Sequence, residues 1–389
     1  MWNRRRPRIY KGFPAASAVR ALLARGVAAG AFPGAVARWG RPEGLVRTVA
    51  VGLRGLTRNR EPVTADLVYD LASLTKLLVT TSLALIFVSR GRLDLDQPLA
   101  GGPLGPALAP GGRSSAADWR RLTPRHLLAH QSGLPPWRPF HSLGGRRADR
   151  CSLALEALRT EVPVAGPGEL TLYSDLNFLL LGFLLEEIGG AGLSELFNRE
   201  LAGPLGLSGT GFKPGPGAVL APTEDGFRYG GPVGLADLKG PTPLGRVHDD
   251  NAAWLGGVAG HAGLFAPAAG AWAIARDWVR AWRQGRGLVF ERPALAEFLR
   301  PVPDRAGLGR PLGFNRRGLA LALASSSWPE TAVGHLAYTG PSLWWAPDHD
   351  FLWLFLTNRV HPRAVNPAWH PADYVGGPAW PQKSRPRDR

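Results

Sequence analysis

The sequence predicts an α/β (α+β) fold, with an antiparallel sheet flanked by helices and built from both chain ends, and with an inserted, mainly helical lobe. Two observations lead to this prediction. Short alternating or apolar runs, typical of strands, occur near both ends of the chain, whereas helical periodicity occupies the middle. The length of 389 residues and the apolar fraction of 45% allow a large buried core.

The N-terminal part carries one helical pattern and two strand patterns. The helical pattern runs from residue 17 to about residue 29, where Gly30 ends it. The runs 34–39 and 45–52, separated by a glycine-containing turn, predict a hairpin. The most apolar run, 77–88, is shorter than the roughly 20 residues that cross a bilayer, so it predicts a core helix and no membrane span.

The rest of the chain completes the predicted fold. Helical patterns in the middle lie at 123–130, 153–160, 177–189 and 193–201, and later ones at 270–282 and 294–299. Strand-like runs follow at 318–324, 342–346 and 351–356. We therefore expect a single domain over residues 1–370, with a sheet lobe from about 17–72 and 245–365 and a helical lobe from about 77–240. Residues 371–389 read as a solvated tail.

Composition limits the classes of partner. The formal net charge is +16, but the arginines are scattered and no nucleic-acid fold signature accompanies them, so we expect no specific nucleic-acid partner. Cys151 is the only cysteine, so no intramolecular disulfide can form. No apolar stretch follows the basic N-terminus before Pro33, so no export signal is recognised and we predict a cytoplasmic location. Oligomeric state stays unknown.

Ser73 and Lys76 stand three residues apart where the apolar run begins. Positions i and i+3 are neighbours on a helix, and a helix N-terminus stabilises negative charge near the serine hydroxyl. The same positive helix end and the flanking leucines predict a lowered pKa for Lys76, whose amine would then accept the serine proton. A lone S-x-x-K pattern fits an N-cap serine beside an exposed lysine at least as well.

Tyr173 and Asp175 lie in the stretch LTLYSDLN, just ahead of a predicted helix. A loop tyrosine at this place can point its phenol into a cleft, or pack over the helix start with its hydroxyl in water. The sequence around Tyr173 alone leaves both alternatives open.

These two motifs resemble the serine β-lactamase and penicillin-binding protein-like superfamily, specifically class C β-lactamases and D-Ala-D-Ala carboxypeptidases in their esterase and amidase branch. The resemblance covers about residues 17–361, and its further stretches are FPGA (32–35), LDLD (93–96), LTPRHLLAHQSGLP (122–135) and PLGL (204–207). GRVHDDNA (245–252) and GGVAGHAGLF (256–265) are similar to a branch that contains N-acetylmuramoyl-L-alanine amidases. The implied fold is β-lactamase/transpeptidase-like, and the single domain is then catalytic.

The resemblance also implies a mechanism without cofactor or metal. Ser73 would attack a carbonyl while Lys76 and Tyr173 pass its proton to the leaving group, and water would then hydrolyse the acyl-enzyme. The backbone N–H groups of Ser73 and Tyr338 would form the oxyanion hole.

The third motif of the superfamily, Lys or His followed by Thr-Gly, matches the stretch His335-Leu336-Ala337-Tyr338-Thr339-Gly340 here. Leu336 has no hydroxyl, Ala337 adds a methyl, and the carboxylate-binding lysine is missing. Asp175 occupies the asparagine position of the Y-x-N motif, where it could orient Lys76. We expect His335 to bind or polarise substrate, or to be hydrogen-bonded at a strand edge. These departures weaken the β-lactamase alternative.

Other histidines fall into two groups. His126 and His130 have zinc-ligand spacing, but the residue after His126 is leucine where a metalloprotease needs glutamate, so we expect buried structural histidines. A polar, glycine-rich segment instead contains His248, Asp249, Asp250 and His261. We interpret His248 and Asp249 as part of a substrate-binding loop, with a supporting hydrogen-bond network as the alternative.

The favoured function is hydrolysis of an amide or ester bond through an acyl-enzyme. The favoured substrate is a peptidoglycan fragment, processed by an amidase or a carboxypeptidase type of reaction. The alternatives are an esterase acting on small esters, a β-lactamase, and a non-catalytic scaffold that keeps the penicillin-recognising fold. A preference for esters or amides would separate the first two activities.

Overall fold

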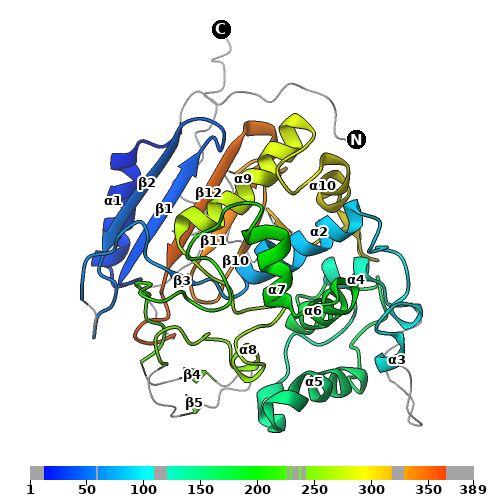
Figure 1. The fold of residues 1–389 in the computed structure, drawn as a ribbon. Coiled ribbons are helices and arrows are strands. Elements are labelled where there is room, and N and C mark those ends of the chain that lie inside the picture. Colours follow the sequence, from blue (N-terminus) through cyan, green and yellow to red (C-terminus); the bar gives the residue numbers. More distant parts are fainter. Residues whose placement is uncertain are drawn as a thin grey trace.

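A six-stranded antiparallel sheet organises the part of the chain that the computed structural model describes, which comprises residues 13–57, 60–108, 121–225, 228–229, 236–237, 242–317 and 328–364. The strand order is β2-β1-β12-β11-β10-β9, so strands from the two chain ends lie side by side (Figure 1). This arrangement confirms the prediction of a sheet built from both ends. The strands are β1 Gly34–Gly40, β2 Val46–Gly52, β9 Asn315–Arg316, β10 Val333–Leu336, β11 Ser342–Ala346 and β12 Phe351–Thr357.

The neighbouring strands β1 and β12 are buried on both faces of the sheet. β1 and β12 pair antiparallel, with Val36 opposite Leu356. Because side chains alternate along a strand, Val36 and Leu356 join the core on the helical side, whereas their neighbours Ala35 and Phe355 pack with helix α1 (Ala16–Ala28) on the other face. Helix α9 (Ala268–Gln284) covers the first of these faces, on the helical side, and contacts both strands. The sheet therefore forms the middle layer of the fold (Figure 1).

The remaining strands are two-residue pieces that tie loops together. β3 (Tyr69–Asp70) pairs with β6 (Phe265–Ala266), β4 (Arg228–Tyr229) with β5 (Ala236–Asp237), and β7 (Val302–Pro303) with β8 (Gly309–Arg310). The strand predicted at 318–324 and the tail predicted at 371–389 lie outside the described residues. The predicted domain boundaries stay a prediction.

Helices lie at each predicted helical segment, with shifted ends. They are α4 Pro124–Leu128, α5 Arg150–Arg159, α6 Asp175–Gly189 and α7 Leu193–Phe197, followed after α9 by α10 Arg292–Leu299. Two short helices, α3 Gly105–Leu108 and α8 Asp250–Trp254, were not predicted. α4 is shorter than predicted at both ends. Thr123 caps its start, and the φ of 55° at His130 lies outside the helical region, so the helix ends before this residue. The segment 193–201 was predicted as one helix, but a π-helical turn, Asn198–Ala202, follows α7.

The apolar run forms the helix at the centre of the molecule. It begins as a π-helical turn, Lys76–Thr81, and continues as α2, Ser82–Ser89. Every residue from Lys76 to Phe87 is buried, which confirms the prediction of a core helix. Among the described residues no single helix is long and apolar enough to cross a membrane, although α6 and the segment Leu193–Ala202 pass that test together as a sharply bent pair.

Candidate active site

Ser73 lies in a tight turn between strand β3 and the central helix. The preceding residue, Ala72, has a φ of 41°, a region that residues with a side chain rarely adopt. The Asp70 carboxylate fixes this turn through two hydrogen bonds. Its Oδ1 accepts the backbone N–H of Ala72 at 2.9 Å, and its Oδ2 accepts the backbone N–H of His248 at 2.7 Å. The turn places Ser73 at the helix start, where backbone N–H groups have no intrahelical acceptor.

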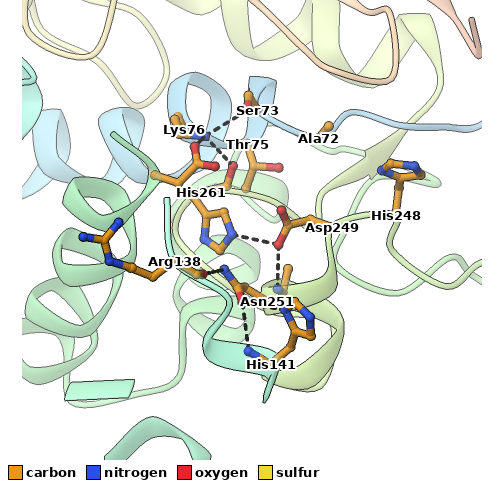
Figure 2. A network of polar contacts seen from close by, with 12 residues as sticks. Ala72, Ser73, Thr75, Lys76, Arg138, His141, His248, Asp249, Asn251 and His261 are labelled. Atoms are coloured by element: carbon orange, nitrogen blue, oxygen red, sulfur yellow. Dashed lines mark hydrogen bonds and ion pairs between the residues drawn. The ribbon is translucent and has the colours of Figure 1, made fainter. Parts of the chain in front are cut away.

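The Ser73 hydroxyl is contacted by two other side chains. Lys76 Nζ donates a hydrogen bond to Ser73 Oγ at 2.9 Å, and the Tyr173 hydroxyl donates to the same oxygen at 3.1 Å. Figure 2 shows Lys76 pointing back along its helix toward Ser73. The structure thus brings together the three residues that the sequence selected as catalytic, although Tyr173 comes from a distant loop. Ser73 Oγ sits between two proton-transfer groups, an arrangement suited to activating a nucleophile.

Lys76 is an ammonium held by three acceptors. Its Nζ lies 2.8 Å from Oδ1 of Asp175 and donates to the carbonyl oxygen of His261 at 3.0 Å, besides its bond to Ser73. Burial is the largest single influence and disfavours the charged form, but Asp175 and Tyr173 together outweigh it and raise the pKa of Lys76. The predicted lowering of this pKa is therefore wrong, because it weighed the helix end and the apolar neighbours but not the charge of Asp175. Asp175 contacts Lys76 directly, as the sequence predicted.

Tyr173 rests against a buried histidine. The His130 ring stacks on it with centroids 4.6 Å apart, and His130 Nδ1 accepts the backbone N–H of Ser174 at 3.0 Å. Burial holds the pKa of His130 well below its usual value, and burial also raises the pKa of Tyr173, so imidazole and phenol are both neutral. His130 is buried, as the sequence predicts, but its position behind Tyr173 was missed.

Strand β10 brings the third motif beside Tyr173. The His335 ring lies 5.9 Å from that of Tyr173 and is 1% exposed, with Nδ1 2.7 Å from its neighbour's carbonyl oxygen, on Leu336. Burial keeps the pKa of His335 well below its usual value, so the imidazole is neutral and carries no charge for a carboxylate. Thr339 ties the end of the motif to the Ser73 turn by donating to the Asp70 carbonyl at 2.8 Å. Direct substrate contact by His335 stays a prediction.

The segment 248–261 supports the site through two acid–histidine pairs. His248 Nε2 lies 2.7 Å from Glu224 Oε2, and its ring stacks on that of Tyr338 at 5.6 Å. Asp249 Oδ1 lies 2.9 Å from His261 Nε2 and also accepts the first-turn N–H of α8. Figure 2 shows Asp249 linking His261 to this helix start. The observed contacts are those of a supporting hydrogen-bond network, and substrate contact by His248 and Asp249 stays a prediction.

Glycines let this segment approach the helical lobe closely. A Cβ at Gly260 would lie 2.1 Å from the Phe178 carbonyl oxygen, so a larger residue would push the segment away. Thr80 Oγ1 donates to the Gly260 carbonyl at 2.6 Å, which fixes the adjoining His261 carbonyl where Lys76 reaches it.

The structure also tests whether the site could hold a metal ion. Among the described residues no group of three or more His, Cys, Asp or Glu side chains is arranged to hold a metal ion, and His126 contacts Thr123 in the cap of α4.

Arg310 of strand β8 was not predicted to lie near the site. Its guanidinium carbon is 5.8 Å from the centroid of the Tyr173 ring. Nothing in its sequence surroundings indicates this position.

The comparison with protein families identifies the chain. A family model described as Beta-lactamase matches residues 19–375, which is most of the chain. The chain belongs to the beta-lactamase family. This result and the fold agree with the resemblance noted in the sequence, and they make the protein a beta-lactamase-family serine hydrolase with a β-lactamase/transpeptidase-like fold.

Individual relatives of this beta-lactamase-family chain differ in their described activities. A Salmonella typhi protein, provisionally named as a D-alanyl-D-alanine carboxypeptidase, is 29% identical over 329 residues, which are 81% of this chain and 74% of the relative. EstCE1, described as a hydrolase with promiscuous acyltransferase activity, superposes with a TM-score of 0.69 at 22% identity over 88% of this chain and 93% of its own. SurE, in a structure with D-Leu, gives 0.61 at 25% identity over 88% of this chain and 71% of its own.

Proposed function

We propose that the protein hydrolyses an amide or ester bond through an acyl-enzyme on Ser73, with a peptidoglycan fragment as the favoured substrate. The observation that carries the proposal is the pair of hydrogen bonds to Ser73 Oγ, from Lys76 at 2.9 Å and from Tyr173 at 3.1 Å. A hydroxyl that lies against two proton-transfer groups can lose its proton as it forms a bond to carbon.

The proposed reaction has two balanced steps. Ser73 Oγ forms a bond to the substrate carbonyl carbon, its proton passes into the Lys76–Tyr173 unit, and the bond to the leaving nitrogen or oxygen breaks as that atom takes up the proton. A water molecule then gives a proton to the same unit and attacks the ester carbon, which frees the acid and restores the serine. The backbone N–H groups of Ser73 and Tyr338 would bind the developing oxyanion, a contribution typically worth about a hundredfold in rate per donor.

Two relatives support a substrate with a D-amino acid. The Salmonella typhi relative is provisionally named for cleavage between two D-alanines, and the SurE structure contains D-Leu. Peptide stems of peptidoglycan fragments contain such residues, in accordance with the amidase-branch resemblance of residues 245–265. His335, His248 and Asp249 would then shape the acyl side of the site, with His248 acting through the ring of Tyr338.

Hydrolysis of small neutral esters is the second candidate. The specific observation in its favour is the neutral His335 at the place where the superfamily binds a carboxylate with lysine, since a neutral ring offers no charge to an acidic substrate. EstCE1 is similar in fold, and that similarity extends no further than the fold.

A substrate panel separates the two candidates. The purified protein is given a muropeptide, a D-Ala-D-Ala peptide, its L-Ala-L-Ala counterpart and a series of p-nitrophenyl esters, in parallel with Ser73→Ala. The proposal predicts Ser73-dependent cleavage of an amide with a preference for the D-configured peptide. Cleavage of esters alone, with no amide product, would establish the second candidate instead.

A further inference from the structure

Arg310 is a buried cation that has no acidic partner among the residues that the structure describes. Arg310 is 4% exposed, and its guanidinium donates a hydrogen bond to the neutral amide oxygen of Asn315. Nε of Arg310 is buried without a hydrogen-bond partner, and no carboxylate of the described ranges lies within ion-pair distance of its guanidinium. An unpaired buried charge is costly, so a fold normally supplies a partner or moves the charge to water.

The ionisable group that Arg310 faces is the phenol of Tyr173. The guanidinium carbon lies 5.8 Å from the Tyr173 ring centroid, and Lys76 Nζ lies 5.3 Å from the same centroid. The other titratable groups around Tyr173 are the neutral imidazoles of His130 and His335 and, beyond Lys76, the Asp175 carboxylate. Burial lowers the pKa of Arg310 to about 10, so the guanidinium stays charged at neutral pH.

We propose that Arg310 is a positioning residue whose positive charge promotes loss of a proton from the Lys76–Tyr173 unit. This inference rests on the proposed function. A positive charge disfavours an ammonium and favours a phenolate, so it eases deprotonation of either member of the unit. The two groups share one macroscopic titration, and the inference concerns that shared step.

The charge at Arg310 opposes the charge at Asp175. Asp175 stabilises the protonated Lys76. A cation that lies against the Tyr173 ring should disfavour it, so removing the two charges should have opposite effects on the pH at which activity appears. A unit charge about 6 Å away in a medium of effective dielectric about 20 shifts a pKa by about 2 units, and a partly hydrated site by less. We therefore expect a shift of about 1–2 pH units for Arg310.

The test uses Arg310→Met, Arg310→Lys and the control Arg305→Met, which removes an exposed arginine from the same β7–β8 loop. The pH dependence of kcat/KM is measured on a p-nitrophenyl ester that the wild type cleaves. Arg310→Met should move the acidic limb up by about 1–2 pH units and lower kcat at pH 7 about tenfold or more, with less effect on KM. Arg310→Lys should restore most of the wild-type profile, and Arg305→Met should leave it unchanged.

The stability of Arg310→Met provides a second readout. Because replacing an unpaired buried charge by an apolar side chain is commonly neutral or stabilising, this variant should melt at or above the wild-type temperature. A variant that fails to fold or melts well below wild type would overturn the inference, since a structural role then explains the arginine. An unshifted acidic limb in a folded variant would also overturn it, while an inactive wild type with no Ser73 adduct would refute the proposed function itself.

Discussion

Nζ of Lys76 lies 2.8 Å from Oδ1 of Asp175, and this ion pair decides the resting protonation of the site. Lys76 is fully buried, and the Asp175 carboxylate raises its pKa despite that burial. The resting protein therefore holds an ammonium beside a neutral phenol, and one of them must lose a proton before Ser73 can pass its own proton on. Charges near this pair control the pH dependence of the reaction.

Asp175→Asn should move the acidic limb of the kcat/KM profile to lower pH by about 1–3 units, the usual effect of an opposite charge at this range. The sign follows because loss of the carboxylate removes the charge that stabilises the Lys76 ammonium, so the amine forms at lower pH. A matched control is Asp96→Asn, which breaks an exposed ion pair with Arg125 and should leave the limb in place. A limb that stays or rises in Asp175→Asn would refute this account of the ion pair.

His130→Ala should reduce activity and stability together. The substitution removes the ring that stacks on Tyr173 and the acceptor for the Ser174 N–H, and it opens a buried cavity. We expect about 2–4 kcal/mol of lost unfolding free energy and at least a tenfold lower kcat/KM. His126→Ala, which loosens only the cap of α4, should cost about 1 kcal/mol and little activity. Denaturant unfolding and ester kinetics on both variants check this, and equal activity losses would contradict it.

Two buried neutral histidines should make the fold sensitive to acid. The folded-state pKa values of His130 and His335 lie well below the unfolded value of about 6.5, with burial as the main cause and the Lys76 and Arg310 charges adding to it. The contribution of the two neutral imidazoles to the free energy of unfolding is fully present above pH 6.5. As the pH falls below 6.5, each histidine loses about 1.4 kcal/mol of this contribution per pH unit.

The corresponding measurement is urea unfolding of the wild type and His335→Gln at pH 8, 7 and 5. Between pH 7 and pH 5, the free energy of unfolding should fall by about 1–2 kcal/mol less in the variant than in the wild type. Between pH 8 and pH 7 the two should change alike. Equal losses at the acidic end would mean that the His335 imidazole is not held neutral.

Thr339→Val should separate activity from stability when compared with a matched variant. Thr339 Oγ1 donates to the Asp70 carbonyl at 2.8 Å and joins the third motif to the Ser73 turn. Thr357 Oγ1 makes an equivalent buried bond, to the Gly34 carbonyl at 2.7 Å, between β12 and β1. Each valine variant should lose about 1–2 kcal/mol of unfolding free energy. Only Thr339→Val should also lower kcat, and a loss of the same size in Thr357→Val would contradict this.

Periodicity and turn residues predicted the local elements of the fold. The hairpin of β1 and β2, the helix α1 and the central apolar helix all lie where alternation or 3.6-residue spacing places them. The π-helical turn that begins at Lys76 was not predicted, because its apolar pattern reads the same as that of an α-helix.

The sequence predicted contacts within the site only where the residues are close in the chain or belong to a familiar motif. The Ser73–Lys76 contact follows from i, i+3 spacing, and Tyr173 entered through the resemblance. The pKa of Lys76 was wrong, and Arg310 and the role of His130 were missed, for one reason. Each depends on how closely distant side chains pack and how deeply they are buried, and one sequence without its fold does not show these distances.

The most direct measurement is the intact mass of the protein after treatment with a fluorophosphonate probe, followed by mapping of the modified peptide. Wild type, Ser73→Ala and the control Ser89→Ala, a serine at the far end of the central helix, are compared. The account predicts one adduct on Ser73 in the wild type and in Ser89→Ala, and none in Ser73→Ala. An adduct that persists in Ser73→Ala, or no adduct in the wild type at any pH tried, would contradict the claim that Ser73 is the nucleophile.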